Sequence, residues 1–476
     1  MVSTFGGLGV AASGLSAARH GLDVVGQNIA NATTTGYTRQ RLSTAAVASL
    51  AQVGPLSGGS PAVGQGVAVV GIARLGDAFL DARARSTAAA SGNLAVQANA
   101  IDSIQKSLNE PGENGISAQL SAFWSSWQDV ANAPGSAAQA GVLLQNAQVL
   151  VGQIASGYTA VDADWTLSRS RLGGMVDELN ASGSQVAALN AEIRSTLARG
   201  GSANELIDQR DALTGSIAAL TGAAVRVLDD GTAEVLVGGN ALVSGDRFHA
   251  VALTGSTTMA GAAASPVALS WVDRPTVPVA VESGEIAGSL SVLAPANATG
   301  TGGTIAEAAA GYDAFATFLA GAVNAVHSTG ASPSGATGLD FFAISGTGPA
   351  ALGLSVVPTS VDGIATGAVG AGGMDASIAD AIGNLGGSAG SPDEAWSSFV
   401  TGIGVTARGL IQQAGLAQSA ADSASATQLA NSSVDLDEEN ISMLTYQAAY
   451  QGAARVLTAM DEMLDVLINH TGIVGR

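Results

Sequence analysis

Apolar residues recur with a heptad spacing at both ends of the chain. Near the N-terminus they alternate at intervals of three and four residues, at Leu8, Ala11, Leu15, Ala18, Leu22, Val25 and Ile29. Near the C-terminus the same alternation runs through Met443, Tyr446, Tyr450, Ala453, Leu457, Met460, Leu464 and Leu467. Either pattern alone is typical of an amphipathic helix on a globular core. Because the two stand at opposite ends of the chain, we predict that the terminal helices pair as a coiled coil.

Further helical patterns lie inside these ends. One apolar stripe, which Pro134 terminates, consists of Ile116, Leu120, Phe123, Trp127 and Val130. Residues 136–199 contain no proline and stay periodically apolar, which predicts long helices with a break near the Leu-Gly-Gly at 172–174. Ser202 and Glu205 have the spacing of a capping box for a further helix through Leu220. Residues 392–433 predict one more long helix.

The middle of the chain consists of short apolar runs between Gly, Ser, Thr and Pro. Residues 223–239 predict a β-hairpin whose turn is Asp230-Gly231, a pair that suits positive φ. Short strands follow to about residue 293, one helix runs from Ile305 to Val326, and loops and strands continue to about residue 372. We therefore predict a mainly α-helical fold with an inserted β-rich domain.

These patterns divide the chain into three predicted domains, two of them built from separate segments. The terminal coiled-coil domain comprises residues 1–70 and 434–476. A long-helix domain comprises residues 71–222 and 373–433, and the β-rich outer domain in the middle of the chain spans residues 223–372.

Charge and hydropathy exclude several kinds of partner. The chain has 38 acidic and 18 basic residues and a formal net charge of −20, so it lacks the basic surface that binds nucleic acid. No window of about 18 uninterrupted apolar residues occurs, so we expect no membrane insertion. The N-terminus has no basic stretch before a continuous apolar run. Any export must therefore use a route that reads an uncleaved N-terminus.

Nothing in the sequence predicts catalysis, a cofactor or a metal. The chain has no cysteine, and its histidines stand far apart in no metal-binding pattern: His20, His249, His327 and His470. The Gly-rich stretches lack the strand, helix and acidic residue of a dinucleotide site. The acidic run at 435–440 could hold Ca²⁺, but its carboxylates fit better at the positive end of a helix dipole. We therefore predict no catalytic, cofactor-binding or metal-binding residues.

Motifs at the two ends resemble those of flagellar rod, hook and hook-associated proteins. The stretch NIANATTTGYTRQR matches the first of these signatures at Asn28, Ile29, Ala30, Asn31, Thr34, Gly36, Tyr37 and Arg39. Gln27 and Thr35 depart from it. The stretch VDLDEENISMLTYQAAYQGAARV is similar to the second signature, with Ser433 where Gly is usual.

The interior narrows this resemblance to one family. NELIDQRDAL at 204–213, DDGTAEVLVGGNALVSG at 229–245, AVNAVHSTG and GLDFF between 322 and 342, and the closing TGIVGR are similar to the hook-associated protein 1 family. The resemblance implies a structural adaptor and not an enzyme. Such an adaptor forms a ring that connects the flagellar hook to the filament, and the filament does not assemble without it.

The resemblance also implies partners and a location. The partners are copies of the chain itself, the hook protein, the second hook–filament junction protein and a flagellar export chaperone. The chain would leave the cell through flagellar type III export without a cleaved signal peptide and would lie outside the cell at the junction. Alternatives are the hook protein or another axial structural protein. From other classes, an extracellular adhesin or a wall hydrolase carried on the axial scaffold remain open.

Finally, the resemblance implies an assembly interface on the terminal helices. Asn28, Asn31 and Gly36 suit the end of the first helix, since Asn and Gly tolerate left-handed backbone and Asn can satisfy free carbonyls. The other residues that we assign to this interface are Leu8, Leu15, Leu22, Ile29, Tyr37, Tyr446, Tyr450, Leu457, Met460, Leu464 and Leu467.

Overall fold

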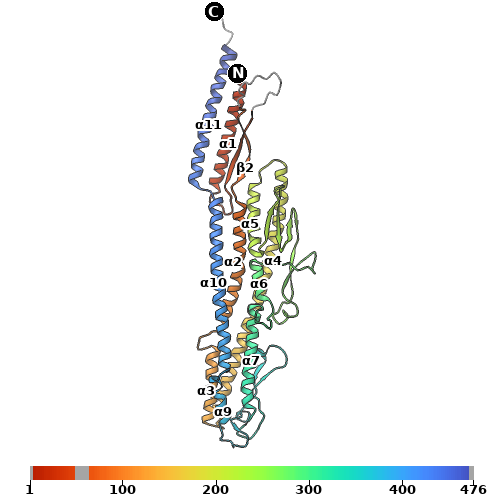
Figure 1. Cartoon of the computed structure of the whole chain (residues 1–476), viewed down its shortest axis with the longest axis vertical. Coiled ribbons are helices and arrows are strands. Elements are labelled where there is room, and N and C mark those ends of the chain that lie inside the picture. Colours follow the sequence, from red (N-terminus) through yellow and green to blue (C-terminus); the bar gives the residue numbers. More distant parts are fainter. Residues whose placement is uncertain (1–3, 49–63, 471–476) are drawn as a thin grey trace, which may run out of the picture.

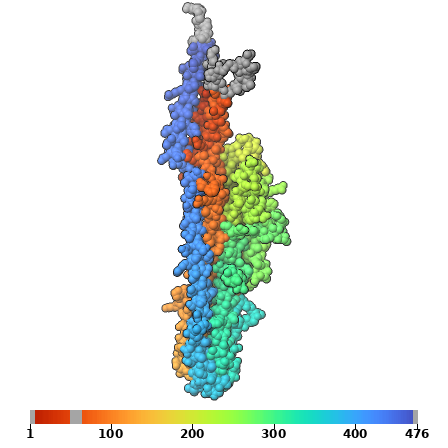
Figure 2. All heavy atoms as spheres, in the orientation of Figure 1, coloured from red at the N-terminus to blue at the C-terminus, as the bar shows by residue number. Residues whose placement is uncertain are grey.

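The protein is elongated, and both ends of its chain lie at the same end of the molecule (Figure 1). The computed structural model describes residues 4–48 and 64–470. The TGIVGR motif and part of the predicted terminal domain lie outside the described residues. Figure 2 shows that the end carrying the termini is narrower than the rest of the molecule.

We call this narrow end the terminal unit. In it, α1 (Thr4–Ala30) and α11 (Leu436–Asp465) run side by side, and α11 continues into a π-helical turn, η3 (Val466–His470). β1 (Gln40–Ala46) and β2 (Val67–Arg74) form an antiparallel hairpin that packs on α1. The two ends of the sequence therefore build one structural unit.

Long helices form the rest of the molecule, which we call the body. α2 (Ala78–Ser107) and α10 (Pro392–Ser432) lie along each other and lead away from the terminal unit. Of the helices that follow α2, α4 (Ala137–Ala198) packs against both α3 (Ile116–Asn132) and α5 (Asn204–Thr221). The largest fully buried side chains are Trp127, Trp165, Trp271, Trp396, Arg210 and Tyr312. Among the described residues, no helix combines the length and the hydropathy that crossing a membrane requires.

α4 is one helix of 62 residues, so the predicted break at 172–174 is wrong. Gly173 and Gly174 have open space where a side chain would stand, and no neighbouring segment bends the helix there. A glycine weakens a helix by about 1 kcal/mol relative to alanine. Burial of the adjacent Leu172 and Val176 outweighs this cost, at about 1.5–3 kcal/mol for each side chain. The long helix predicted over 392–433 is confirmed as α10.

The strands of the body are short and form small antiparallel sheets. The largest has four strands in the order β3 (Ala224–Val227), β4 (Ala233–Val237), β5 (Asn240–Ser244) and β6 (Arg247–Phe248). Its first two strands are the predicted hairpin, and Gly231 in the turn has a φ of 82°, so that prediction is confirmed. Three further pairs are β7 (Val251–Thr254) with β8 (Ala268–Trp271), β10 (Phe342–Ile344) with β11 (Leu354–Val356), and β9 (Gly330–Ala331) with β12 (Gly367–Ala368).

Two asparagines of α4 attach these sheets to the helix. Asn190 is fully buried; its Nδ2 donates to the carbonyls of Ala233 and Gly245, and its Oδ1 accepts from the backbone N of Ala233. Asn180 makes the same two-way contact with the backbone of Val251. The sheets are therefore fixed to the long helix through their own backbone groups.

The predicted β-rich range also contains helices of the body. α6 (Gly284–Leu293) packs on α2 and α4, and α7 (Thr304–His327) packs on α4 and α10. The shorter turns are α8 (Ala350–Gly353), η1 (Val361–Gly363), α9 (Ser377–Gly383) and η2 (Leu385–Gly387). Buried residues of this range and of the long helices form one continuous cluster. The described chain is thus mostly helical with a few small sheets, and a separate β-rich domain with the boundaries given above stays a prediction.

His327, at the end of α7, is buried as a neutral imidazole. The backbone N–H of Ala365 can only donate, and it lies 2.8 Å from Nε2 of this ring. The proton must therefore be on Nδ1, which donates to the carbonyl of Leu339 at 2.7 Å. The ring also packs against Trp127 and Phe341. Burial lowers the pKa of His327 below its ordinary value of 6.5.

This burial predicts a pH dependence of stability. Between the lowered pKa and about 6.5, the unfolded chain binds a proton at His327 that the folded chain does not bind, so the free energy of unfolding should fall as the pH drops. Denaturant titrations at about pH 7.5 and about pH 5.5 measure this difference. His327→Gln should reduce it, whereas His249→Gln, at a more exposed histidine, should keep it. An unchanged difference in His327→Gln would assign the effect to another group.

Candidate assembly interface

Glycines of α1 form a close seam with α11. Gly7, Gly14 and Gly21 are spaced seven residues apart and therefore share one face of the helix. A Cβ atom at Gly7 would stand less than 2.5 Å from Cε of Met460, and one at Gly21 would stand 2.4 Å from Cε1 of Tyr446. The two helices pack this closely because glycine places no side chain between them.

The seam also fixes the relative direction of the helices. At Gly14 the nearest atom to an added Cβ is Cβ of Ala453, at 3.8 Å, which is ordinary van der Waals contact. Ascending positions in α1 meet descending positions in α11, since the pairs are Gly7 with Met460, Gly14 with Ala453 and Gly21 with Tyr446. The helices are therefore antiparallel, as Figure 1 also shows. Whether they supercoil as a coiled coil stays a prediction.

The predicted leucines of α1 lie at the rim of this seam. The heptad residues divide into a half-buried set, Leu8, Leu15, Leu22 and Ile29, and a buried set, Ala11, Ala18 and Val25. Small residues thus form the centre of the contact with α11, and the larger ones remain partly open to solvent. Their role in assembly stays a prediction.

α11 presents two apolar faces. Of the residues predicted for the interface, Tyr446, Leu457, Met460 and Leu464 are half-buried, whereas Tyr450 and Leu467 are 40% and 59% exposed. A second set faces solvent and comprises Ile441, Leu444, Val456, Met463 and Val466. Several large apolar side chains exposed along one helix are typical of a contact with another molecule.

A buried polar cluster, which we call the joint, closes the helix pair next to the body. Asn28, in the last turn of α1, is 1% exposed. Its Oδ1 accepts from the hydroxyl of Tyr37 at 2.8 Å and from the backbone N of Gln40 at 3.0 Å. Its Nδ2 donates to the carbonyl of Gln40 at 2.9 Å and to Oε2 of Glu439 at 3.1 Å. One side chain thus connects α1, β1 and α11 and uses its full hydrogen-bonding capacity.

Arg39 neutralises the carboxylates at the start of α11. Its Nε donates to Oε1 of Glu439 at 2.7 Å, and its Nη1 pairs with Glu438. Glu439 is only 2% exposed, and removing the partner of such a charge typically costs about 3–5 kcal/mol. Asp435 caps the same helix by accepting from the backbone N of Asp437 and Glu438. The prediction that these carboxylates begin the last helix is confirmed.

An ion-pair cluster attaches the joint to α5 of the body. Arg74, the last residue of β2, donates from Nε to Oδ1 of Asp208 at 2.9 Å and from Nη1 to Oδ2 of Asp211 at 3.1 Å. The backbone N of Thr38 donates to Oδ2 of Asp208 at 3.2 Å, and its hydroxyl accepts from Arg74. The loop after α1 and the end of β2 therefore share one anchor on the body.

Gln40 adds a second attachment to α5. Its Oε1 accepts from Nδ2 of Asn204 at 3.1 Å, and its Nε2 donates to Oε1 of Glu205 at 3.3 Å. Because these two side chains contact the hairpin, they do not cap their own helix. The predicted capping box of Ser202 and Glu205 is wrong, since α5 follows Ala203 without a side-chain cap.

The joint also perturbs the ionisation of Tyr37. Burial raises the pKa of this phenol to about 12, and the negative charges of Asp208, Glu205 and Glu439 act in the same direction. The hydroxyl therefore stays protonated at physiological pH and remains a donor to Asn28.

The loop between α1 and β1 has the geometry of a helix end. Nδ2 of Asn31 donates to the carbonyl of Gln27 at 3.0 Å, and its Oδ1 accepts from the hydroxyl of Thr34 at 3.2 Å. Gly36 has a φ of 80°, which glycine adopts without strain. These residues end α1 and redirect the chain into β1.

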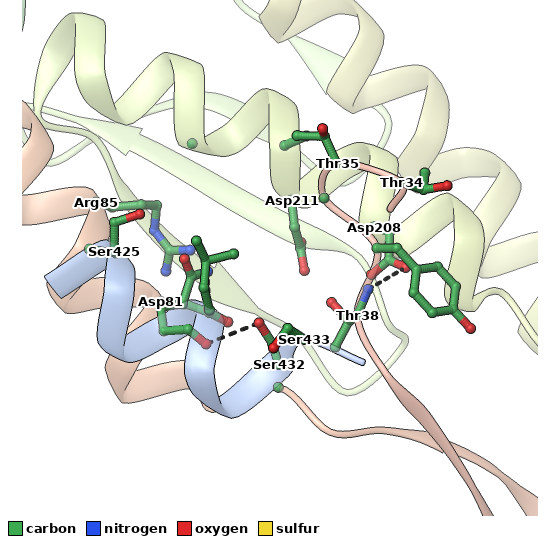
Figure 3. Close-up of a pocket in the computed structure, with 18 of the residues that line it drawn as sticks. Thr34, Thr35, Thr38, Asp81, Arg85, Asp208, Asp211, Ser425, Ser432 and Ser433 are labelled. Carbon is green, nitrogen blue, oxygen red and sulfur yellow. Dashed lines mark hydrogen bonds between the residues drawn. The ribbon is translucent and has the colours of Figure 1, made fainter. Parts of the chain in front are cut away.

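A polar pocket lies between this loop and the long helices of the body (Figure 3). Thr34 and Thr35 of the loop, with Asp211 of α5, line one side, and Arg85 of α2 and Ser425 of α10 line the other. Neither this pocket nor any other part of the described chain has three or more His, Cys, Asp or Glu residues placed to hold a metal ion.

The helix pair, with Asn28 and Glu439 of the joint, lies in segments that match two families of flagellar proteins. Residues 8–38 match the family described as "Flagella basal body rod protein". Residues 427–469 match "Flagellar basal body rod FlgEFG protein C-terminal". The first segment is most of α1 with its loop, and the second contains α11. The chain is therefore a structural component of the axial part of the bacterial flagellum.

The body identifies the family within this class. Residues 101–342, which are more than half of the chain, match "Flagellar hook-associated protein FlgK helical domain". The chain belongs to the FlgK family of flagellar hook-associated proteins, a structural family that is not known for enzymes.

Individual relatives agree with this assignment. Flagellar hook-associated protein 1 of Bacillus subtilis is 27% identical, and the alignment covers 100% of both chains. The proteins of that name from Escherichia coli and Salmonella typhimurium are 28% and 30% identical over 70% of this chain, but over only 59% and 58% of their own length. The solved structure of the flagellar hook junction protein FlgK from Burkholderia pseudomallei has the same fold, with a TM-score of 0.63 at 15% identity. That alignment covers 74% of this chain and 100% of the solved chain.

The predicted interface did not include the body side of the joint or the glycine seam. Asn204, Glu205, Asp208 and Asp211 lie at i, i+1, i+4 and i+7 within the NELIDQRDAL motif, a spacing that places polar residues on one helix face. The seam glycines also repeat every seven residues. Both spacings are present in the sequence, but neither the polar residues nor the glycines belong to the apolar heptad stripes.

Substitution of seam glycines tests the close approach of the helices. Gly21→Leu should separate α1 from α11, because its side chain needs the space that the ring of Tyr446 occupies. Gly14→Ala should be tolerated and should stabilise α1 by up to about 1 kcal/mol, since its Cβ meets only Ala453 at contact distance. Hydrogen exchange of the α1 and α11 amides measures both effects.

Gly26→Leu is the matched control, because Gly26 lies on the same helix with open space around it. It should leave the protection of α11 unchanged. Equal loss of protection in Gly21→Leu and Gly26→Leu would contradict a close-packed seam.

Proposed function

We propose that copies of this chain form a ring that connects the flagellar hook to the filament and that the filament needs for assembly. The observation that carries the proposal is the construction of the terminal unit. It contains the two segments that match families of rod-type axial proteins, and it leaves large apolar side chains of α11 open to solvent. The relative of known structure is itself named a flagellar hook junction protein.

In this proposal the partners divide between the two ends of the ring and the chain's own copies. The hook protein lies on one side, the second hook–filament junction protein lies on the other, and neighbouring copies contact each other through their terminal units. Before export, a flagellar chaperone covers the apolar face of α11. The chain leaves the cell by flagellar export without a cleaved signal peptide and is extracellular at the junction.

The half-buried face of α11 supports the use of the terminal unit in assembly. Leu457 lies at its centre, and the rim leucines of α1 remain partly open beside it. In a closed ring, a defect in this face repeats in every subunit, so a moderate cost for one copy disrupts the whole assembly.

Leu457→Asp should therefore abolish assembly while leaving the body folded. Replacing a packed leucine costs about 2–5 kcal/mol when it is fully buried, and a carboxylate in the same place adds a desolvation cost. In cells that lack their own copy, the variant should be secreted but should not retain filament subunits. Filament length and the amount of secreted protein are the measurements.

Gln447→Asp introduces the same carboxylate at an exposed position of α11 and should support normal filaments. If Leu457→Asp cells swim as well as Gln447→Asp cells, the terminal unit is not the assembly element. A variant that is not secreted does not test assembly, so secreted protein must be scored in the same culture.

A further inference from the structure

The helix pair of the terminal unit has two different lateral sides, and the hairpin lies on one of them, which we call the hairpin side (Figure 1). There Val24 of α1 and Leu42 of β1 line a pocket together with Ile441 and Thr445, so the solvent face of α11 opens to the hairpin side. Exposed residues continue this face at intervals of three or four: Leu444, Ala448, Gly452, Val456, Ala459 and Met463. The hairpin side of α11 therefore carries large apolar residues separated by small ones.

The rim leucines of α1 lie on the opposite side. Ser13 precedes the seam residue Gly14 by one position, and its hydroxyl accepts from the backbone N of the first residue of β2 at 3.2 Å. Successive residues of a helix are turned by about 100°, so Leu15, one position after Gly14, points away from the hairpin. Leu8 and Leu22 follow the other two seam glycines in the same way. We call this the rim side, and its leucines are half-buried.

The seam sets which residues of the two sides lie at the same height. Because α1 and α11 are antiparallel, each step forward in α1 from the pair of Gly14 and Ala453 matches one step backward in α11. The rim leucines and the hairpin-side residues level with them are Leu8 with Ala459, Leu15 with Gly452, and Leu22 with Thr445. Each leucine is therefore level with a smaller side chain, and Gly452 has open space around it.

One pair of positions reverses this size relation. Ile441, on the hairpin side, is 66% exposed. It is level with Gly26 of α1, which lies four residues after Leu22 on the rim side and has open space where a side chain would stand. Where the hairpin side protrudes, the rim side is thus recessed, and the two sides are complementary in shape.

The two sides are also complementary in charge. Arg41 of β1 is exposed and lines the pocket beside Ile441. Asp23 is exposed on the outer edge of the rim side, and it lies three residues from Gly26, or about 4.5 Å along the helix. Within the described part of the chain, neither side chain has an ion pair or a hydrogen bond. Each side therefore carries one unpaired charge of opposite sign, at nearly the same height.

We propose that in the ring the rim side of one terminal unit packs against the hairpin side of the next. Leu15 then fills the gap at Gly452, Ile441 of the neighbour lies over Gly26, and Asp23 pairs with the neighbour's Arg41. The contact rests on the proposed function, because it specifies how adjacent copies hold each other. Its two halves lie on opposite sides of the same unit at one height, so rotation alone repeats the contact and closes a ring.

Paired cysteines test this contact, because the chain has none of its own. Leu22→Cys places a thiol on the rim side, and Thr445→Cys places one at the same height on the hairpin side. The two variants carry different tags and are expressed together in cells that lack the native copy, and isolated flagella are then oxidised. The expected product is a dimer that carries both tags, with no dimer of either variant alone.

Thr458→Cys is the matched control, because Thr458 is also an exposed threonine of α11 but lies outside the hairpin side. It should give no dimer with Leu22→Cys. Same-tag dimers, cross-links to another flagellar protein, or no cross-link in assembled flagella would each overturn the proposed contact.

A size exchange tests the contact without cysteines. Gly26→Leu should lower the amount of the chain in isolated flagella by about tenfold, equivalent to about 1.4 kcal/mol, because its side chain occupies the space of the neighbour's Ile441. Adding Ile441→Ala to the same chain should restore assembly. Gly174→Leu, at an exposed glycine of α4 that also has open space, should assemble normally. Normal assembly of Gly26→Leu, or no recovery with Ile441→Ala, would contradict the packing.

The location of the native chain separates this proposal from the proposed function, and immunogold labelling of isolated flagella measures it. If the native chain is at the hook–filament junction and the paired cysteines do not cross-link, the side-by-side contact is wrong and the function stands. If the native chain is absent from the junction, the proposed function is wrong, and the contact fails with it.

Discussion

A buried carboxylate must be neutralised and hydrogen-bonded, and in this chain Glu439 imposes that requirement on both ends of the sequence. Its partners are Asn28 and Arg39, which precede it by 411 and 400 residues. The start of α11 is therefore stable only where the end of α1 and the start of the hairpin are already in place. The body lies between these segments in sequence. Its fold must therefore bring the start of α11 back beside the end of α1.

The seam and the joint hold the terminal unit in different ways. At the seam, Gly7 and Gly21 let α1 and α11 come close, and contact of this kind has little positional specificity of its own. The joint supplies specificity, because the four hydrogen bonds of Asn28 are satisfied in only one register of α1, β1 and α11. Arg74 then fixes this unit to α5 through Asp208.

The joint also lies where two kinds of sequence meet. The helix pair belongs to segments that rod-type axial proteins share, whereas Asp208 lies in the segment specific to FlgK. A general axial element is thus attached to a family-specific body by a few ion pairs and hydrogen bonds. In this chain the polar residues of the NELIDQRDAL motif therefore attach the terminal unit to the body.

The sequence predicted the helices well, because heptad spacing follows directly from helix geometry. It also predicted the carboxylates that begin α11 and the turn at Gly231. The prediction from sequence was wrong where the helix propensity of a single residue is opposed by tertiary packing. Gly173 and Gly174 suggested a break that burial of their neighbours overrides.

The predicted capping role of Glu205 is wrong for a related reason. Its carboxylate accepts a hydrogen bond from Gln40, which is far away in sequence. The contacts within the joint could not be predicted for the same reason: the polar residues are visible in the sequence, but they come from three distant segments, and one sequence does not show which of them will meet. The range from 223 to 372 was described as β-rich, yet α7 within it lies against α4 in the body. The sequence shows the helical spacing of apolar residues from Ile305 to Val326. It does not show that this helix packs on the long helices of the body.

The central claim is that the joint makes α1 and α11 one cooperative unit, and Asn28→Asp tests it most directly. The change keeps the shape of the side chain but replaces the donor to Glu439 with a second carboxylate oxygen. Native-state hydrogen exchange should show the amides of α1 and α11 losing protection together, while those of α3 and α4 keep theirs. Loss of protection in α1 alone, or no loss in either helix, would contradict the account.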